Sequence, residues 1–295
     1  METWIAILVT AAVVATGAAA MRSRLLADGG ASHVAVVLRR ELIAAIAAVC
    51  VAAVWAIVFA VQNETTSVPV PAASYMLLVP LLAGVVYALA SSAVVAAWPR
   101  ASGPVRSAQV QSRVLAQLVT RADLLIHVAA VALFVVVAAV GAALSRDGLT
   151  LAWGWNEGSG TFAGIVVNSM FPGARITAPL AVALAVVLAA TWFGVWLVVR
   201  RPSLVGAAHA EDLALRRISI RRTLGLSSAS IIAVDGGLIA LAGAGVSTAF
   251  PDEAVGHAGS VVGYAGFALV VAAVVVAVLA FVRRPRAEVD EGSRG

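Results

Sequence analysis

The stretch LSSASIIAVDGGLIALAGAGV, which occupies residues 226–246, decides the fold class of this chain. Its only charged residue is Asp235, and most of its other residues are aliphatic or small. A helix rises about 1.5 Å per residue, so a segment of this length crosses the roughly 30 Å hydrocarbon core of a bilayer. Because lipid offers the backbone no hydrogen-bond partners, an apolar segment inside it forms a helix. The stretch therefore predicts a membrane-spanning helix.

Six other apolar segments resemble this one in length. Hydrophobic residues make up 62% of the 295 residues and charged residues only 12%, whereas soluble proteins average about 45–50% and about 25%. We expect an all-α fold, a polytopic transmembrane helical bundle that forms one domain over residues 1–295 and ends in a disordered tail at 283–295. The seven predicted spans are 4–20, 42–61, 75–97, 124–144, 179–199, 226–246 and 261–282.

The arginines set the orientation of these spans. All twenty basic residues are arginine, and only Arg146 and Arg175 lie in the connections on one side. Short loops rich in arginine face the cytoplasm, so we expect the N-terminus outside and the C-terminus inside. This placement also explains the net charge of +5 without a nucleic-acid partner. The other eighteen arginines lie in 21–41, 98–122, 200–225 and 283–295.

The first segment, 4–20, has the charge pattern of a retained anchor. Arg22 and Arg24 follow it, and Glu2 is the only charged side chain before it. A secretory signal carries its positive charge before the apolar run. We therefore expect an N-out membrane anchor and not a cleaved signal.

Asp235 is the one acidic residue deep within a predicted span. It lies ten residues after Gly225, about 15 Å into the membrane, where insertion of an ionised Asp costs about 2.5–3.5 kcal/mol. No predicted span holds an arginine that could neutralise it, so we expect it to be protonated or solvated through a polar cavity. Two interpretations stay open: an acid that bonds a neighbouring carbonyl or hydroxyl, and a proton or cation site.

Two faces of the same helix carry different residues. Arg221, Ser228 and Asp235 follow one another at seven-residue intervals and form one polar stripe. Small residues centre on another face and predict a seam for close helix packing. These small residues are Ala229, Ala233, Gly236, Ala240 and Gly243.

His127 follows Asp123 by four residues on the predicted span 124–144, so the two side chains can touch. An Asp that holds a His ring suits proton transfer or a pH-sensitive contact. The alternative is an ordinary helix start, in which the helix dipole favours Asp123 and His127 lies near the headgroups. The candidate intramembrane ion or proton site thus comprises Asp235, Ser228, His127 and Asp123.

Four arginines crowd into residues 211–222: Arg216, Arg217, Arg221 and Arg222. Such a cluster can bind the phosphates of anionic lipid head groups or a protein partner. The alternative is that these arginines simply mark the cytoplasmic side.

The connection 145–178 is the largest on the outer side. Its Trp153, Trp155 and Glu157 are the candidate contacts for an extracytoplasmic ligand, because they combine aromatic rings with a carboxylate. The apolar run 162–167 is too short to span, and could lie in the interface, re-enter between helices or cap the bundle. A packed lid without a ligand is the alternative.

Several classes of site are excluded by what the sequence lacks. Without lysine there is no phosphate-loop lysine and no Schiff base. The single Cys50 can form neither an intrachain disulfide nor a thiolate cluster. His127 is the one histidine within a predicted span, which disfavours haem ligation by two histidines. We expect no enzymatic activity, no cofactor and no metal.

Two segments in the middle third of the chain combine prolines with arginines. The first contains Trp98, Pro99, Gly103, Pro104, Arg106, Ser107, Ala108 and Arg113, and the second contains Arg200, Arg201, Pro202, Asp212, Leu213, Arg216 and Arg217. In these residues the chain resembles uncharacterised polytopic membrane proteins of actinobacteria. The resemblance implies a source and a topology in the bacterial cytoplasmic membrane, and it transfers no activity.

Taken together, these features predict a non-enzymatic membrane subunit or interaction scaffold, with a protein partner or a second copy of the chain as its partner. The alternative is a small secondary transporter or channel that uses Asp235, with or without His127, for a proton or cation. A third hypothesis is a sensor whose outer loop reports to the cytoplasmic arginines.

Overall fold

The computed structural model describes residues 41–56, 72–96, 118–145, 148, 150–153, 165–201, 209–250 and 253–282. The predicted first span, 4–20, and the predicted tail, 283–295, lie outside these residues.

Six helices make up almost all of the described chain. Five of them, α3 to α7, are long and apolar enough to cross a membrane, and the sixth, Glu41–Ala56, is shorter. The predicted class, a bundle of long apolar helices, is confirmed, whereas the described residues do not reach the predicted count of seven spans. The long helices are α3 (Ala72–Ala96), α4 (Arg121–Leu144), α5 (Ala174–Arg200), α6 (His209–Ala249) and α7 (Ala254–Val282).

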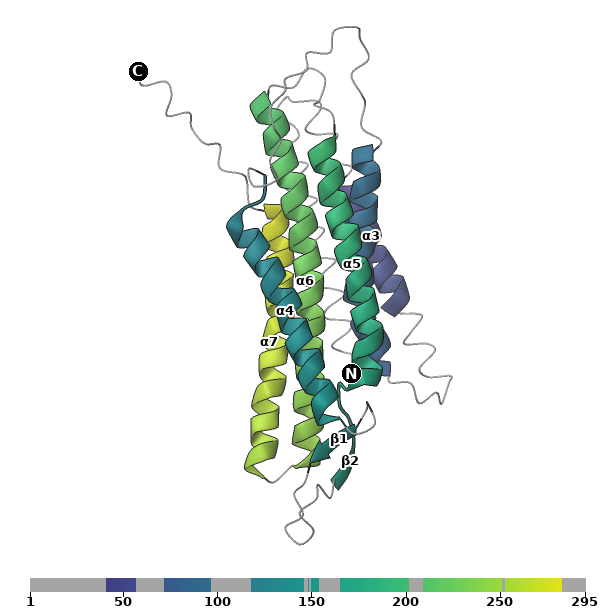
Figure 1. Ribbon diagram of the computed structural model, residues 1–295, viewed down its shortest axis with the longest axis vertical. Coiled ribbons are helices and arrows are strands. Elements are labelled where there is room, and N and C mark those ends of the chain that lie inside the picture. Colours follow the sequence, from purple (N-terminus) through teal and green to yellow (C-terminus); the bar gives the residue numbers. More distant parts are fainter. Residues whose placement is uncertain are drawn as a thin grey trace, which may run out of the picture.

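Helix α6 is the central element of the bundle, because α3, α4, α5 and α7 all pack against it (Figure 1). It runs parallel to α4 and antiparallel to α3, α5 and α7 (Figure 1). We call the end where α5 finishes and α6 begins the arginine-rich end, and the opposite end the strand end.

Helix α6 begins well before its predicted span. The sequence predicted a cytoplasmic connection over 200–225, but α6 already starts at His209 and continues without interruption to Ala249. Asp212 and Arg216 are four residues apart and form an ion pair on one side of this helix, which supports the helical conformation of a polar segment.

Helices α6 and α7 approach each other through glycines. A Cβ atom on Gly236 would lie 2.6 Å from the carbonyl oxygen of Gly266, and Gly243 is equally close to the α7 backbone at Gly259. Only glycine permits such close backbone contact. The predicted seam of small residues is therefore confirmed, and its partner is α7.

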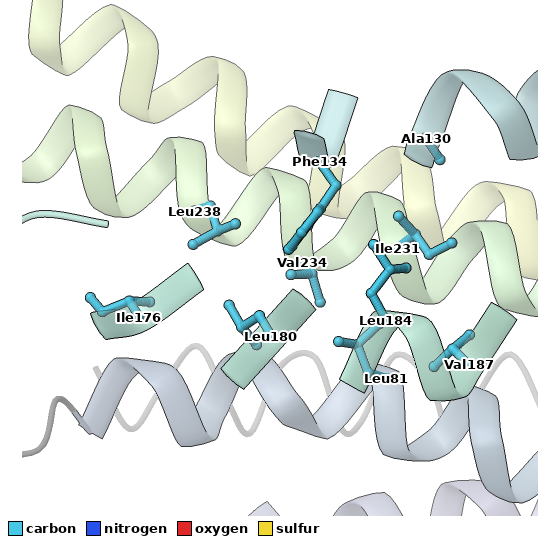
Figure 2. Close-up of a cluster of buried hydrophobic side chains, with 10 residues drawn as sticks. All are labelled: Leu81, Ala130, Phe134, Ile176, Leu180, Leu184, Val187, Ile231, Val234 and Leu238. Atoms are coloured by element: carbon cyan, nitrogen blue, oxygen red, sulfur yellow. The ribbon is translucent and has the colours of Figure 1, made fainter. Parts of the chain in front are cut away.

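The main hydrophobic core joins α3, α4, α5 and α6 (Figure 2). Helix α6 contributes Ile231, Val234 and Leu238, at the spacing of one helix face. The other members are Leu81, Ala130, Phe134, Ile176, Leu180, Leu184 and Val187.

A small antiparallel sheet occupies the outer connection that the all-α prediction left without strands. Strand β1 (Thr150–Trp153) pairs with β2 (Ile165–Met170) between α4 and α5. Leu151 of β1 packs with Phe171 and Phe250 in a separate apolar cluster. The apolar run 162–167, predicted to lie in the interface, re-enter or cap the bundle, overlaps β2 from Ile165 onward. The cluster lies at the strand end of the bundle.

Candidate functional site

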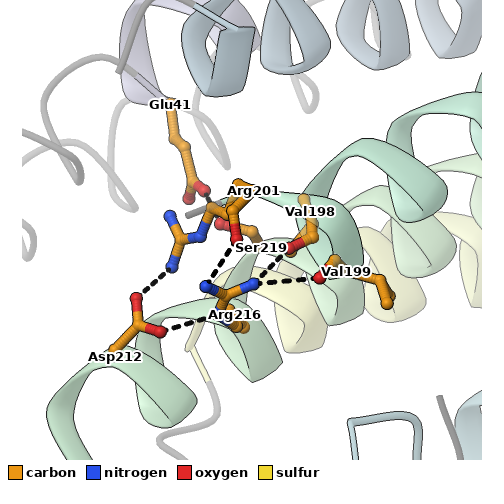
Figure 3. A network of polar contacts seen from close by, with 7 residues as sticks. All are labelled: Glu41, Val198, Val199, Arg201, Asp212, Arg216 and Ser219. Carbon is orange, nitrogen blue, oxygen red and sulfur yellow. Dashed lines mark hydrogen bonds and ion pairs between the residues drawn. The ribbon is translucent and has the colours of Figure 1, made fainter. Parts of the chain in front are cut away.

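The arginine-rich end holds a buried ionic network centred on Arg216 (Figure 3). The Arg216 guanidinium, 1% exposed, donates to Asp212 Oδ2 at 2.7 Å and to the carbonyl oxygens of Val198 at 2.7 Å and Arg201 at 2.9 Å. A further contact reaches the Val199 carbonyl at 3.2 Å. These carbonyls belong to the end of α5, where a helix has no partners of its own for them. Arg216 therefore caps α5 from the side of α6.

Asp212 also pairs with Arg201, the residue that follows α5. Arg201 Nη2 donates to Asp212 Oδ1 at 3.2 Å, and both side chains are more than nine-tenths buried. The carboxylate thus lies between two guanidinium groups, which compensates for its removal from water. The spacing of Asp212 and Arg216 was visible in the sequence, but the role of Arg201 was not.

A second ion pair joins two helices far apart in the sequence. Arg222 of α6 donates to Glu41 of the Glu41–Ala56 helix, and Ser219 donates to the other oxygen of the same carboxylate. The Arg222 guanidinium also lies over the ring of Phe281 in α7, 5.1 Å from its centroid. Together these contacts tie three helices to one point, and no spacing in the sequence could have predicted the pairing of Glu41 with Arg222.

These contacts change the interpretation of the four clustered arginines as a lipid or partner contact. Arg216 and Arg222 are buried against internal carboxylates and carbonyls, so they do not present charge to a lipid phosphate or a partner. Arg221 is half-buried and lies 3.8 Å from Asp123. Arg217 is half-buried as well. The hypothesis of a lipid or partner contact therefore rests on Arg217 and Arg221 alone.

Asp123 lies at the start of α4, where it contacts Thr120 and Arg221 and forms no hydrogen bond with His127. Thr120 Oγ1 accepts a hydrogen bond from the Asp123 amide at 3.1 Å and donates to Asp123 Oδ2 at 2.6 Å. This is N-terminal capping, with the carboxylate at the favourable end of the helix dipole. Of the two interpretations of Asp123, the ordinary helix start describes its contacts.

His127 instead reaches across to α6. Its Nδ1 lies 3.1 Å from Ser228 Oγ, and Ser228 donates its hydroxyl proton to the Leu224 carbonyl at 2.8 Å. A hydroxyl has one proton, so the His127 Nδ1–H donates to Ser228 when both bonds form. The Nε2 atom is then the acceptor of the neutral ring, and it is buried without a partner. The structure thus brings together two of the residues of the predicted site, Ser228 and His127.

Asp235 lies two turns farther along the same stripe. It is 0% exposed, and neither carboxyl oxygen has a hydrogen-bond partner. Seven residues of helix separate it from Ser228, about 10 Å. Because α4 and α6 are parallel and His127 contacts Ser228, Phe134 of α4 lies at the level of Asp235. On α6 itself the preceding residue, Val234, belongs to the main hydrophobic core.

Two hydroxyl groups that the sequence analysis passed over are buried near the level of Ser228. Thr191 of α5 and Ser227 of α6 are 0% and 2% exposed, and neither hydroxyl has a partner. A Cβ on Gly194 would lie 3.6 Å from Thr223 Cγ2. The antiparallel register then places Thr191 at about the level of Ser227. Apolar helices commonly contain Ser and Thr, so no sequence signal distinguished them.

The proposed outer-loop contacts lie mostly beyond what the structure describes. Trp153 is the last residue of β1, and Trp155 and Glu157 fall in the undescribed part of the connection. The ligand hypothesis for this loop stays a prediction.

Within the described ranges, no group of three or more His, Cys, Asp or Glu side chains could hold a metal ion. No protein-family model matches the chain, and no curated protein and no solved structure matches it either.

Proposed function

We propose that this chain is a non-enzymatic subunit or scaffold of a membrane assembly. It would cross a bacterial cytoplasmic membrane seven times, with the N-terminus outside and the arginine-rich end in the cytoplasm. The arginine distribution supports this orientation, because every described arginine except Arg175 lies at the end of the bundle where α5 finishes and α6 begins.

The burial of Asp235 without a partner is the observation that carries the proposal. A carrier of protons or ions needs polar groups, or water, next to its charged site. Asp235 is fully buried, and no described side chain forms a hydrogen bond with its carboxyl group. The other buried carboxylates, Glu41 and Asp212, are paired with arginines that join helices. In this arrangement the polar groups serve assembly of the bundle.

Purification of the full chain in a mild detergent tests the proposal. We expect a reproducible protein partner or a second copy of the chain to accompany it. An unrelated polytopic protein with the same tag is the control. A chain that elutes alone and monomeric, from several mild detergents, contradicts the proposal.

A specific observation favours a second candidate, a proton- or cation-coupled transporter. Buried polar atoms without partners occur on His127 of α4, Thr191 of α5, and Ser227 and Asp235 of α6. Polar groups inside a membrane protein usually mark a pathway for ions or protons. On this hypothesis the described state is closed, and opening would hydrate these groups.

Flux measurements in proteoliposomes separate the two candidates. The isosteric substitution Asp235→Asn should abolish proton-coupled flux if Asp235 carries the proton. Ser247→Ala, at an exposed position whose hydroxyl bonds its own helix, is the control. Equal fluxes for the wild type and Asp235→Asn, at equal insertion, contradict the transporter.

A further inference from the structure

The outer face of α5 carries an aromatic stripe that ends in an arginine. Trp192, Trp196 and Arg200 are spaced by four residues and therefore lie on one face of the helix. The Trp192 and Trp196 side chains are 39% and 46% exposed. Phe193 stacks on Trp196, with ring centroids 5.9 Å apart. We call these four residues the α5 stripe.

Arg200 is positioned at the end of this stripe by its neighbour. Its guanidinium carbon lies 4.7 Å from the centroid of the Trp196 ring, a distance at which the ring attracts the cation. A stacked guanidinium keeps its N–H groups directed outward in its own plane, where they match the oxygens of a phosphate. No carboxylate in the described segments forms an ion pair with Arg200.

The ionic network compensates the negative charge that would otherwise repel an anion from the end of α5. The end of a helix carries partial negative charge on its free carbonyls, which repels anions. At the end of α5, Arg216 binds the carbonyl oxygens of Val198, Val199 and Arg201 from the inner side. The outer side therefore presents the Arg200 charge beside carbonyls that are already compensated.

The inner end of the stripe is fixed as well. Trp192 packs edge-on against the His127 ring of α4, with centroids 6.3 Å apart. The stripe thus extends from the level of the Ser228–His127 contact to the end of α5. Tryptophan rings favour the headgroup region of a bilayer, and an arginine one turn farther out reaches the phosphates.

We propose that the α5 stripe binds an anionic phospholipid, with its phosphate on Arg200 and its glycerol and upper acyl chain against Trp196 and Trp192. This site takes the place of the lipid contact predicted at Arg216 and Arg222, whose side chains face the interior of the bundle. The inference does not depend on whether the chain is a subunit or a transporter.

Lipid titration of the full-length protein tests the site. The protein in mild detergent is titrated with phosphatidylglycerol, phosphatidylcholine or inorganic phosphate, and bound lipid is counted by native mass spectrometry. One arginine near a membrane surface contributes about 1 kcal/mol to the binding of anionic lipid, equivalent to about fivefold in affinity. We expect phosphatidylglycerol to bind at least fivefold more tightly than phosphatidylcholine, and Arg200→Gln to remove this preference.

Matched variants make the result specific. Arg175→Gln changes an exposed arginine at the other end of α5 and should leave the preference unchanged. Arg200→Lys should keep most of it, since the charge remains, and Trp196→Leu should weaken it. Unaltered phosphatidylglycerol binding by Arg200→Gln overturns the proposal. Equal binding of the two lipids, or displacement of phosphatidylglycerol by inorganic phosphate at similar concentrations, overturns it too.

Discussion

Replacement of Arg216 by leucine is the sharpest test of the ionic network. The change removes a guanidinium that is 1% exposed, together with its bonds to Asp212 and to three carbonyls at the end of α5. A buried carbonyl without a partner costs about 1–3 kcal/mol, and leucine supplies no donor. Asp212 keeps Arg201 at 3.2 Å, so its charge is not left isolated.

The size of the effect follows from the carbonyl groups. Three carbonyls at the lower limit of that range sum to about 3 kcal/mol, and the larger cost of an uncompensated buried charge does not apply because Asp212 keeps Arg201. We expect Arg216→Leu to reduce the free energy of unfolding by about 3 kcal/mol.

The assay is reversible unfolding of the purified protein in mixed micelles, followed by tryptophan fluorescence. Arg221→Leu provides the control, because Arg221 is half-buried and lies 3.8 Å from Asp123. Such a pair contributes about 0.2–1 kcal/mol. If Arg216→Leu destabilises the protein no more than Arg221→Leu does, the capping role assigned to Arg216 is wrong.

Three further predictions concern other contacts. Glu41→Gln should destabilise the protein by about 3–5 kcal/mol, because it leaves the Arg222 charge buried and uncompensated. The double variant Glu41→Leu with Arg222→Leu should restore most of the stability, and a double-mutant cycle measures the difference. Gly236→Val should separate α6 from α7 at a cost of about 1–3 kcal/mol, seen as a lower unfolding midpoint, since even a Cβ would lie 2.6 Å from the Gly266 carbonyl oxygen. Asp235→Leu should raise the free energy of unfolding by about 1–3 kcal/mol by removing an unpaired buried polar group, and a decrease would show that Asp235 has a stabilising partner.

Hydrophobic patterning predicted the long helices well, because a lipid environment leaves the backbone few alternatives. The predicted spans for α3, α4, α5 and α7 agree with the observed helices within a few residues at their arginine-rich ends. At the other ends the observed helices begin or end up to seven residues from the prediction, as at Ala254 for α7. The sequence missed the early start of α6, since hydropathy does not detect a polar helix stabilised by ion pairs.

The candidate site was predicted in part. The seven-residue spacing of Arg221, Ser228 and Asp235 placed them on one stripe, and two of them contact α4. Sequence spacing also suggested a contact between Asp123 and His127. In the structure Asp123 bonds to Thr120, and His127 contacts Ser228. Local spacing shows which residues can meet, and competition from other helices decides which do.

Periodicity and polarity are properties of a single helix, so the sequence alone showed that α6 is apolar and long enough to span a membrane, with an acid on one face and a packing seam on another. The packing of the bundle determined that α7 occupies the seam, that Glu41 pairs with Arg222 and that Arg216 faces inward. Those outcomes depend on the register between helices, which many weak contacts along their length determine together. Asp235 shows the division most clearly: its position along the helix could be counted from the sequence, but its complete burial without a hydrogen-bond partner results from the packing of the bundle.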